Sequence, residues 1–183
     1  MFTMNILQNE VVRLRAPEFS DLDLIYEWEN NPEIWLISNT ITPFSKYVLK
    51  KYLETAHLDL YQSKQLRLMI DAKNTEDALY PTIGSIDLFD FDPYHQRAGI
   101  GILIAETRYR QKGYATYALD LISTYCFTAL SLKQLWCSIP ADNEASLKLF
   151  LKEGFEICGK RKNWLKTGNG WLDDYFLQKQ SPF

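Results

Sequence analysis

Apolar side chains recur along the chain at two spacings, and the shorter of them, a period of two, predicts strands. Leu66, Leu68 and Ile70 alternate with more polar neighbours in this way. The connection over residues 91–96 is rich in turn residues, which predicts a hairpin between the strands on either side. We expect strands at Val11–Arg15, Leu66–Ile70, Thr82–Phe89, Gly99–Ile104, Leu135–Ile139, Phe155–Gly159 and Trp171–Gln178.

Helical spacing of apolar residues, together with capping residues, predicts two helices in the N-terminal part of the chain. The first begins at Ser20, whose hydroxyl we expect to cap the first turn with Asp23 placed to reach back, and it ends at Asn31-Pro32. The second begins at Pro43, a residue suited to the first helical position. Its apolar face is formed by Leu49, Leu53, Ala56 and Leu60.

Two more helices follow the fourth and fifth strands. One opens at Gly113, and the other runs from Asn143 to Glu153 and closes on Gly154, a residue suited to a left-handed cap. The order of elements is therefore βααβββαβαββ. Strands that meet directly and then alternate with helices predict an α/β fold, with one mixed sheet and helices on both of its faces.

Size and composition are those of an ordinary globular protein. The chain has 183 residues, of which 46% are hydrophobic and 23% charged, so we expect residues 1–183 to form a single domain. The net charge of -3 gives no reason to expect a nucleic-acid partner. No apolar run approaches the ~20 residues of a membrane span, and no signal peptide is visible. Three cysteines without paired spacing and two histidines indicate neither a disulfide framework nor a metal site, so we expect a cytoplasmic protein.

Candidate chemistry concentrates where the fourth expected strand passes through a basic turn into a helix. The free N–H groups and partial positive charge of a helix N-terminus favour an anion such as a pyrophosphate, and Gly113 lets the backbone approach it closely. Taken alone, the same residues could be an ordinary tight turn. The segment reads Arg110-Gln111-Lys112-Gly113-Tyr114-Ala115.

That segment resembles the Arg/Gln-x-x-Gly-x-Gly/Ala acetyl-CoA motif of the GNAT acetyltransferases. A second segment, over residues 143–155, resembles a further GNAT signature in which an Asn opens a helix that closes on Gly-Phe. The resemblance extends from Val11 to Gln178 and is strongest to the branch that holds ribosomal-protein N-terminal acetyltransferases and bacterial spermidine acetyltransferases. It implies a mostly antiparallel sheet that is splayed at a cofactor cleft, and acetyl-CoA as the acyl donor.

The resemblance also implies roles for individual residues. Leu103, Ile104 and Ala105 would end the splayed central strand and pair through their backbone with the pantetheine arm. The amides of Arg110–Ala115 would hold the pyrophosphate, and Asn143 would contact the pantetheine from across the cleft. For Asn143 a plain helix cap is the alternative.

Two residues depart from the family pattern. Phe150 stands where the family often has a Tyr as general acid for the departing thiolate, and Phe150 would then only line the cofactor site. Gly99 stands where spermidine acetyltransferases tend to have a Glu. An α-amine has a reference pKa of ~7.7–8.0 against ~10.4 for a lysine-like amine, so a site without strong acid and base residues suits an α-amine better.

Candidates for the remaining roles come from the strands beside the cleft. Asp87 could act as a base through water, and Cys137 and Ser138 lie across the cleft, although a solvent-facing carboxylate and a buried structural thiol are the plain alternatives. The acceptor could be drawn by Glu33 and Asp87 and walled by Trp35 and Trp171, among other aromatic and acidic residues.

The sequence therefore predicts an acetyl-CoA-dependent N-acetyltransferase whose favoured acceptor is a protein or peptide N-terminal α-amine. A small-molecule amine such as a polyamine or an amino sugar is the alternative acceptor. A non-catalytic acyl-CoA-binding module is a third reading, motivated by Phe150. The partners are acetyl-CoA and an amine, and the sequence leaves a homo-oligomer open.

Overall fold

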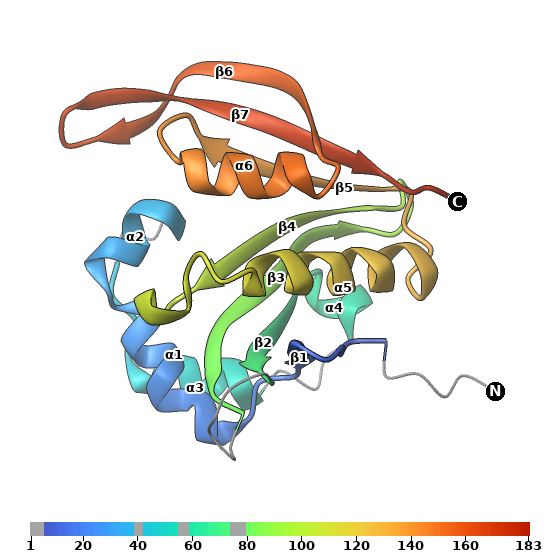
Figure 1. The fold of residues 1–183 in the computed structure, drawn as a ribbon. Helices are drawn as coiled ribbons and strands as arrows, with labels where there is room; N and C mark the ends of the chain where they lie inside the picture. Colours follow the sequence, from blue (N-terminus) through green and yellow to red (C-terminus); the bar gives the residue numbers. More distant parts are fainter. Residues whose placement is uncertain (1–5, 39–41, 55–58, 74–79) are drawn as a thin grey trace.

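One mixed β-sheet organises the protein. The computed structural model describes residues 6–38, 42–54, 59–73 and 80–183, and within them seven strands pair in the order β1-β2-β3-β4-β5-β7-β6 (Figure 1). All neighbours are antiparallel except β4 and β5, which are parallel. The strands are β1 (Val12–Arg15), β2 (Leu66–Ala72), β3 (Thr82–Asp92), β4 (Arg97–Ile104), β5 (Gln134–Pro140), β6 (Glu156–Thr167) and β7 (Gly170–Gln180).

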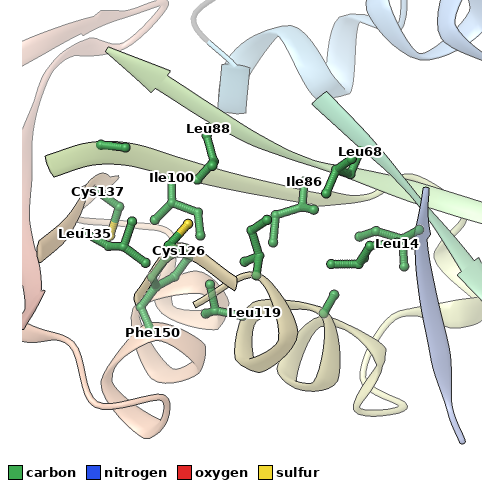
Figure 2. Close-up of a cluster of buried hydrophobic side chains, with 14 of the residues drawn as sticks. Leu14, Leu68, Ile86, Leu88, Ile100, Leu119, Cys126, Leu135, Cys137 and Phe150 are labelled. Carbon is green, nitrogen blue, oxygen red and sulfur yellow. The ribbon is translucent and has the colours of Figure 1, made fainter. Parts of the chain in front are cut away.

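Helices cover both faces of this sheet, as the sequence predicted. They are α1 (Leu22–Glu29), α2 (Pro32–Ser38), α3 (Lys46–Glu54), α4 (Leu60–Ser63), α5 (Tyr114–Thr128) and α6 (Glu144–Lys152). Strand alternation divides the core between the faces. Leu68 and Ile70 of β2 pack in the cluster that includes α5 and α6, whereas Met69 packs with α1, α2 and α3. Figure 2 shows Leu119 of α5 and Phe150 of α6 in the first cluster, beneath Ile100 of β4.

The sheet opens between its two parallel strands. Residues Arg97–Gly99 of β4 pair with Gln134–Trp136 of β5, and beyond these positions the strands diverge. Figure 1 shows that β3 and β4 diverge from the β6–β7 hairpin toward the left of the view, and that α2 lies below the outer end of the hairpin. The predicted splay is therefore confirmed, and it leaves one edge of Ile100–Ile104 without a strand partner on the β5 side.

The first helix begins differently from the prediction. Ser20 is not its cap but lies inside a 3-10 turn, Phe19–Asp21, that precedes α1. The Asp21 carboxylate accepts the backbone N–H of Glu18 at 2.7 Å and is held by both terminal nitrogens of Arg15, at 2.7 and 2.8 Å. Asp23 instead pairs with Lys46 at 2.7 Å. The contact between Arg15 and Asp21 overrides the local signal of Ser20.

Two more helix boundaries differ. Helix α1 ends at Glu29, just before the expected end at Asn31-Pro32. Asn31-Pro32 instead starts α2, which was not predicted: the Asn31 side chain accepts the N–H of Glu33 at 2.9 Å, and Pro32 is the first helical residue. The helix expected from Pro43 begins at Lys46, because Ser45 accepts the N–H of Val48 at 3.2 Å. This helix ends at Glu54, so Leu60 does not belong to its apolar face but begins a separate helix, α4, which Asp59 caps; Ala56 lies outside the described residues.

The C-terminal elements match the prediction more closely. The β3–β4 hairpin, the helix after Gly113 and the cap at Gly154, with a φ of 83°, are confirmed. Strand β6 continues past the predicted end at Gly159 to Thr167 and pairs with β7 along a longer, bulged hairpin. No helix in the described part of the chain is both long and apolar enough to cross a lipid bilayer.

Candidate active site

A cavity of about 520 Å³ fills the opening between β4 and β5. Helices α1 and α2 contribute to it from one face of the sheet, and α6 contributes from the other. The cavity therefore passes through the gap in the sheet. Two ligands approaching from opposite faces would meet beside Leu103, which lines the gap.

An ion cluster forms the wall below α1. Arg67 of β2 lies opposite Asp87 of β3 and donates to both of its carboxylate oxygens, at 2.7 and 3.2 Å. A third nitrogen of Arg67 donates to Glu29 of α1 at 2.5 Å. Burial alone would lower the pKa of Arg67, but the two carboxylates outweigh burial and raise it. All three side chains line the cavity, so this wall holds two negative charges and one positive charge.

Aromatic rings form the wall nearest to the point where β4 and β5 separate. Phe89 and Trp136 meet edge to face with ring centres 5.1 Å apart, and Trp136 stacks on Phe176 at 5.5 Å. Phe89 fits because Gly99, its partner across the strands, has no side chain: a Cβ there would lie 2.3 Å from the ring. Gly99 therefore leaves room for an aromatic wall at this position.

The opposite wall comes from β5 and the β6–β7 hairpin. Arg161 donates to the buried carboxylate of Asp174 at 2.8 Å and also to the hydroxyl of Ser138. Cys137 is buried, and burial, with the nearby charge of Asp174, raises the pKa of its thiol to about 12. The thiol therefore stays protonated at neutral pH, which argues against a nucleophilic role for Cys137.

Helix α6 presents its first two turns to the cavity. The side chain of Asn143 accepts the N–H of Ser146 at 3.1 Å and so caps the helix, which leaves its amide N–H groups for a ligand. Phe150 lies one turn further on, with 3% of its surface exposed and its ring packed edge to face on Phe155. Asn143, Ser146 and Phe150 all line the cavity.

The basic turn stands outside the cavity, at the N-terminus of α5. Gly113 has a φ of 87°, and a Cβ there would meet only a ring carbon of Tyr117 at 3.8 Å, so the backbone at Gly113 is open to approach. The guanidinium of Arg110 donates to the carbonyl oxygens of Ile104 and Ala105, at 2.9 and 3.1 Å, and thereby ties the turn to the end of β4. Gln111, Lys112, Tyr114 and Ala115 complete this turn and the start of the helix.

Ala105 differs from the prediction in its backbone bonding. It lies just beyond β4, its N–H donates to the carbonyl of Ile83 at 2.9 Å, and its carbonyl accepts from Arg110. Both polar backbone atoms of Ala105 are thus used inside the protein. Leu103 and Ile104 remain in the strand, beside the gap.

The predicted site residues are only partly gathered in one place. The cavity is lined by Asp87, Leu103, Cys137, Ser138, Asn143 and Phe150. Glu33 is exposed, Trp171 is 59% exposed on the outer hairpin, and neither lines the cavity. Trp35 does not line the cavity either. Its indole N–H donates to the backbone carbonyl of Glu29, a residue that does line it, at 2.5 Å.

Sequence reasoning missed Arg67, Arg161 and Ser146. The two arginines owe their place to strand register, since Arg67 pairs with Asp87 and Arg161 with Asp174 across neighbouring strands. Their charge was visible in the sequence, but the register was not. Ser146 carried a usable signal, because it lies three residues after Asn143 on the same helical face.

Known proteins that are similar to this chain include N-acetyltransferases. A family model described as "Acetyltransferase (GNAT) domain" matches residues 12–156. The spermidine N(1)-acetyltransferase of Escherichia coli K12 is 26% identical over 152 residues, which cover 81% of this chain and 75% of that protein. An uncharacterized N-acetyltransferase p20 of Bacillus licheniformis is 27% identical over 175 residues, 95% of each chain.

A solved structure shares the fold. Spermidine N-acetyltransferase from Vibrio cholerae, in complex with CoA and spermine, superposes with a TM-score of 0.82 at 23% identity and covers 94% of this chain and 97% of its own. These findings contradict the expectation of a protein or peptide N-terminal α-amine as favoured acceptor, because relatives matched over most of their length are named for spermidine. That expectation relied on the missing Tyr and on the pKa of free amines.

The motif at Arg110–Ala115, the splayed strands and the match over residues 12–156 agree. The chain belongs to the GNAT acetyltransferase family and is an N-acetyltransferase with acetyl-CoA as its acyl donor.

Proposed function

We propose that this enzyme acetylates a primary amine of a small cationic molecule, with diamines and polyamines as the favoured class. The observation that carries the proposal is the charge of the cavity. Among the described residues that line it, the carboxylates of Glu29, Asp87 and Asp174 outnumber the guanidinium groups of Arg67 and Arg161 by one. A concave site with a net negative charge and low-dielectric walls attracts a cation. The spermidine-acetylating relatives support the same class.

Acetyl-CoA enters, in this proposal, from the face of the sheet that carries α5 and α6. The amides of the turn at Arg110–Ala115 hold the pyrophosphate at the N-terminus of α5. The pantetheine arm lies along Leu103 and Ile104, where the edge of β4 lacks a strand partner, and Asn143 contacts it from α6. The thioester then reaches the gap in the sheet, and the acceptor reaches it from the side of α1 and α2.

Asp87 prepares the acceptor for attack. A lysine-like amine has a reference pKa of ~10.4, so deprotonating it at pH 7 costs about 4–5 kcal/mol. Both oxygens of Asp87 accept from Arg67, and each keeps a second lone pair for the acceptor ammonium or for a water that takes its proton. The free amine attacks the thioester carbonyl carbon, the carbon–sulfur bond breaks, and CoA leaves as a thiolate. The new amide nitrogen gives up its extra proton to water or to that thiolate.

The thiolate leaves without an acidic ring hydroxyl at position 150. The reference pKa of a thiol is ~8.5, so a thiolate near neutral pH is uphill by about 2 kcal/mol. Phe150 therefore does not prevent turnover. Positioning of amine and thioester at the gap supplies part of the rate.

The test compares two aspartates of β3. Asp87 lines the cavity, whereas Asp90 is exposed and lies outside it. We expect Asp87→Asn to lower kcat/KM for spermidine on the order of 10²-fold, the range of a lost general base. We expect Asp90→Asn to leave it unchanged. Equal effects of the two substitutions would contradict a reaction in this cavity.

We also propose that the enzyme works in the cytoplasm. Cys126, Cys137 and Cys158 are all free, and Cys158 is exposed. Free thiols are typical of a reducing compartment, which supports this location.

A further inference from the structure

Arg67 stands at the centre of the ion cluster that it forms with Glu29 and Asp87, and it contacts charged groups on two other elements. It binds Asp87 of β3 through two nitrogens and Glu29 of α1 through a third. The aromatic ring of Tyr52, from α3, lies 5.9 Å from its guanidinium carbon. The side chains of Glu29, Arg67 and Asp87 are 19%, 23% and 31% exposed, so water screens them only in part.

The charges in this cluster do not cancel. Two carboxylates face one guanidinium, which leaves one negative charge for a ligand. The other ion pair of the cavity, Arg161 with Asp174, is neutral as a unit. Burial raises the pKa of Tyr52, so its hydroxyl stays neutral near neutral pH. Gly101, which lies opposite Asp87 on β4, adds no charge.

We propose that Arg67 determines the charge preference of the acceptor site: it neutralises one of the two carboxylates of Glu29 and Asp87, so that this cluster binds a single ammonium group of a diamine or polyamine. This inference rests on the proposed function. The amine that is to react occupies the single uncompensated charge beside the gap in the sheet, and the rest of the acceptor lies against the aromatic wall of Phe89 and Trp136.

The consequence is a predictable change in specificity. Replacing Arg67 with Met keeps a long apolar side chain and removes its charge, which leaves Glu29 and Asp87 with two negative charges. The site of the Arg67→Met variant then favours an acceptor with two ammonium groups more strongly than the wild-type site does. Replacing Glu29 with Gln as well returns the site to one negative charge, so the double variant matches the wild type in charge while lacking the arginine.

The experiment measures kcat/KM for 1,4-diaminobutane and for 1-aminobutane, which have the same carbon chain and differ by one charge. We expect Arg67→Met to raise the ratio of diamine to monoamine by about tenfold, because one full charge is added in a partly buried site. We expect Arg67→Met/Glu29→Gln to restore the wild-type ratio, even where its absolute rate is lower. Glu29→Gln alone leaves a neutral cluster and lowers the ratio.

Four outcomes would overturn the inference. Turnover of both amines by the wild type, with the same ratio in Arg67→Met, would remove Arg67 as a determinant of charge and leave the proposed function intact. A double variant that keeps the ratio of Arg67→Met would have the same effect. Where Arg67→Met does not fold, the fall in ratio expected of Glu29→Gln decides the question, and no fall overturns the proposal. Absence of turnover with every amine would overturn the proposed function and this inference together.

Discussion

Two glycines of β4 offer a matched test of the aromatic wall. Gly99 and Gly101 lie on the same face of the strand and near the same ring, that of Phe89. A Cβ added at Gly99 would lie 2.3 to 2.7 Å from three atoms of this ring, whereas a Cβ at Gly101 would lie 3.8 Å from it. The first distance is a collision, and the second is an ordinary van der Waals contact.

The collision sets the magnitude of the expected effect. Phe89 is held against Trp136, so Gly99→Ala must displace the ring or the strand. Overpacking of this kind costs about 1–3 kcal/mol. Gly101→Ala has room and removes freedom from the unfolded chain, so we expect it to leave the free energy of unfolding unchanged or to raise it by up to about 1 kcal/mol.

Urea unfolding followed by tryptophan fluorescence measures both effects. A double-mutant cycle with Phe89→Ala identifies the partner, because Gly99→Ala should cost little once the ring is absent. Equal changes in the free energy of unfolding for Gly99→Ala and Gly101→Ala would rule out a collision with Phe89. A cost of Gly99→Ala that is the same with Phe89→Ala as without it would rule it out as well.

Three further predictions concern the basic turn at Gly113, the cap of α6 at Asn143 and the loss of stability at acid pH. Gly113→Val should abolish calorimetric binding of acetyl-CoA while the fold persists, because a β-branched residue is strained at a φ of 87° and crowds the approach to the turn; unchanged affinity in a folded variant would contradict this. Asn143→Ala should lower stability by about 0.5–2 kcal/mol and also weaken acetyl-CoA binding, whereas Asn143→Asp keeps the cap; normal binding by a destabilised Asn143→Ala would leave only the capping role. Burial would raise the pKa of Asp21, but its bonds from Arg15 and the Glu18 N–H outweigh burial and lower it. The stabilisation of the fold by ionised Asp21 is therefore complete above pH ~4, and it is lost as the pH falls below that value. Asp21→Asn should flatten the acid limb of the stability profile, and an unchanged limb in thermal unfolding would count against it.

Local signals predicted those parts of the fold that short segments determine. The helix after Gly113 and the cap at Gly154 depend on backbone conformations that glycine adopts easily, and both glycines have a positive φ. The start of α1 could not be predicted in this way. It depends on Arg15, which reaches Asp21 from β1 and replaces the cap expected at Ser20.

The same division applies to the site. Asn143 and Phe150 were predictable because both belong to one helix with a recognisable sequence pattern. Arg67 was not, because it enters the site through its register with Asp87 on another strand. The acceptor was predicted wrongly because the pKa of a free amine was given more weight than the carboxylates, Asp87 among them, that could draw a cation.

We propose that acetyl groups pass from acetyl-CoA to small cationic amines at the opening between β4 and β5. The decisive experiment measures kcat/KM with acetyl-CoA and, in parallel, spermidine, 1,4-diaminobutane and a peptide with a free N-terminus, with the acetylated product identified by mass spectrometry. We expect one N-acetylated amine for each CoA released and a higher kcat/KM for the two cationic amines than for the peptide. CoA release without an acetylated amine, or a higher kcat/KM for the peptide, would contradict it.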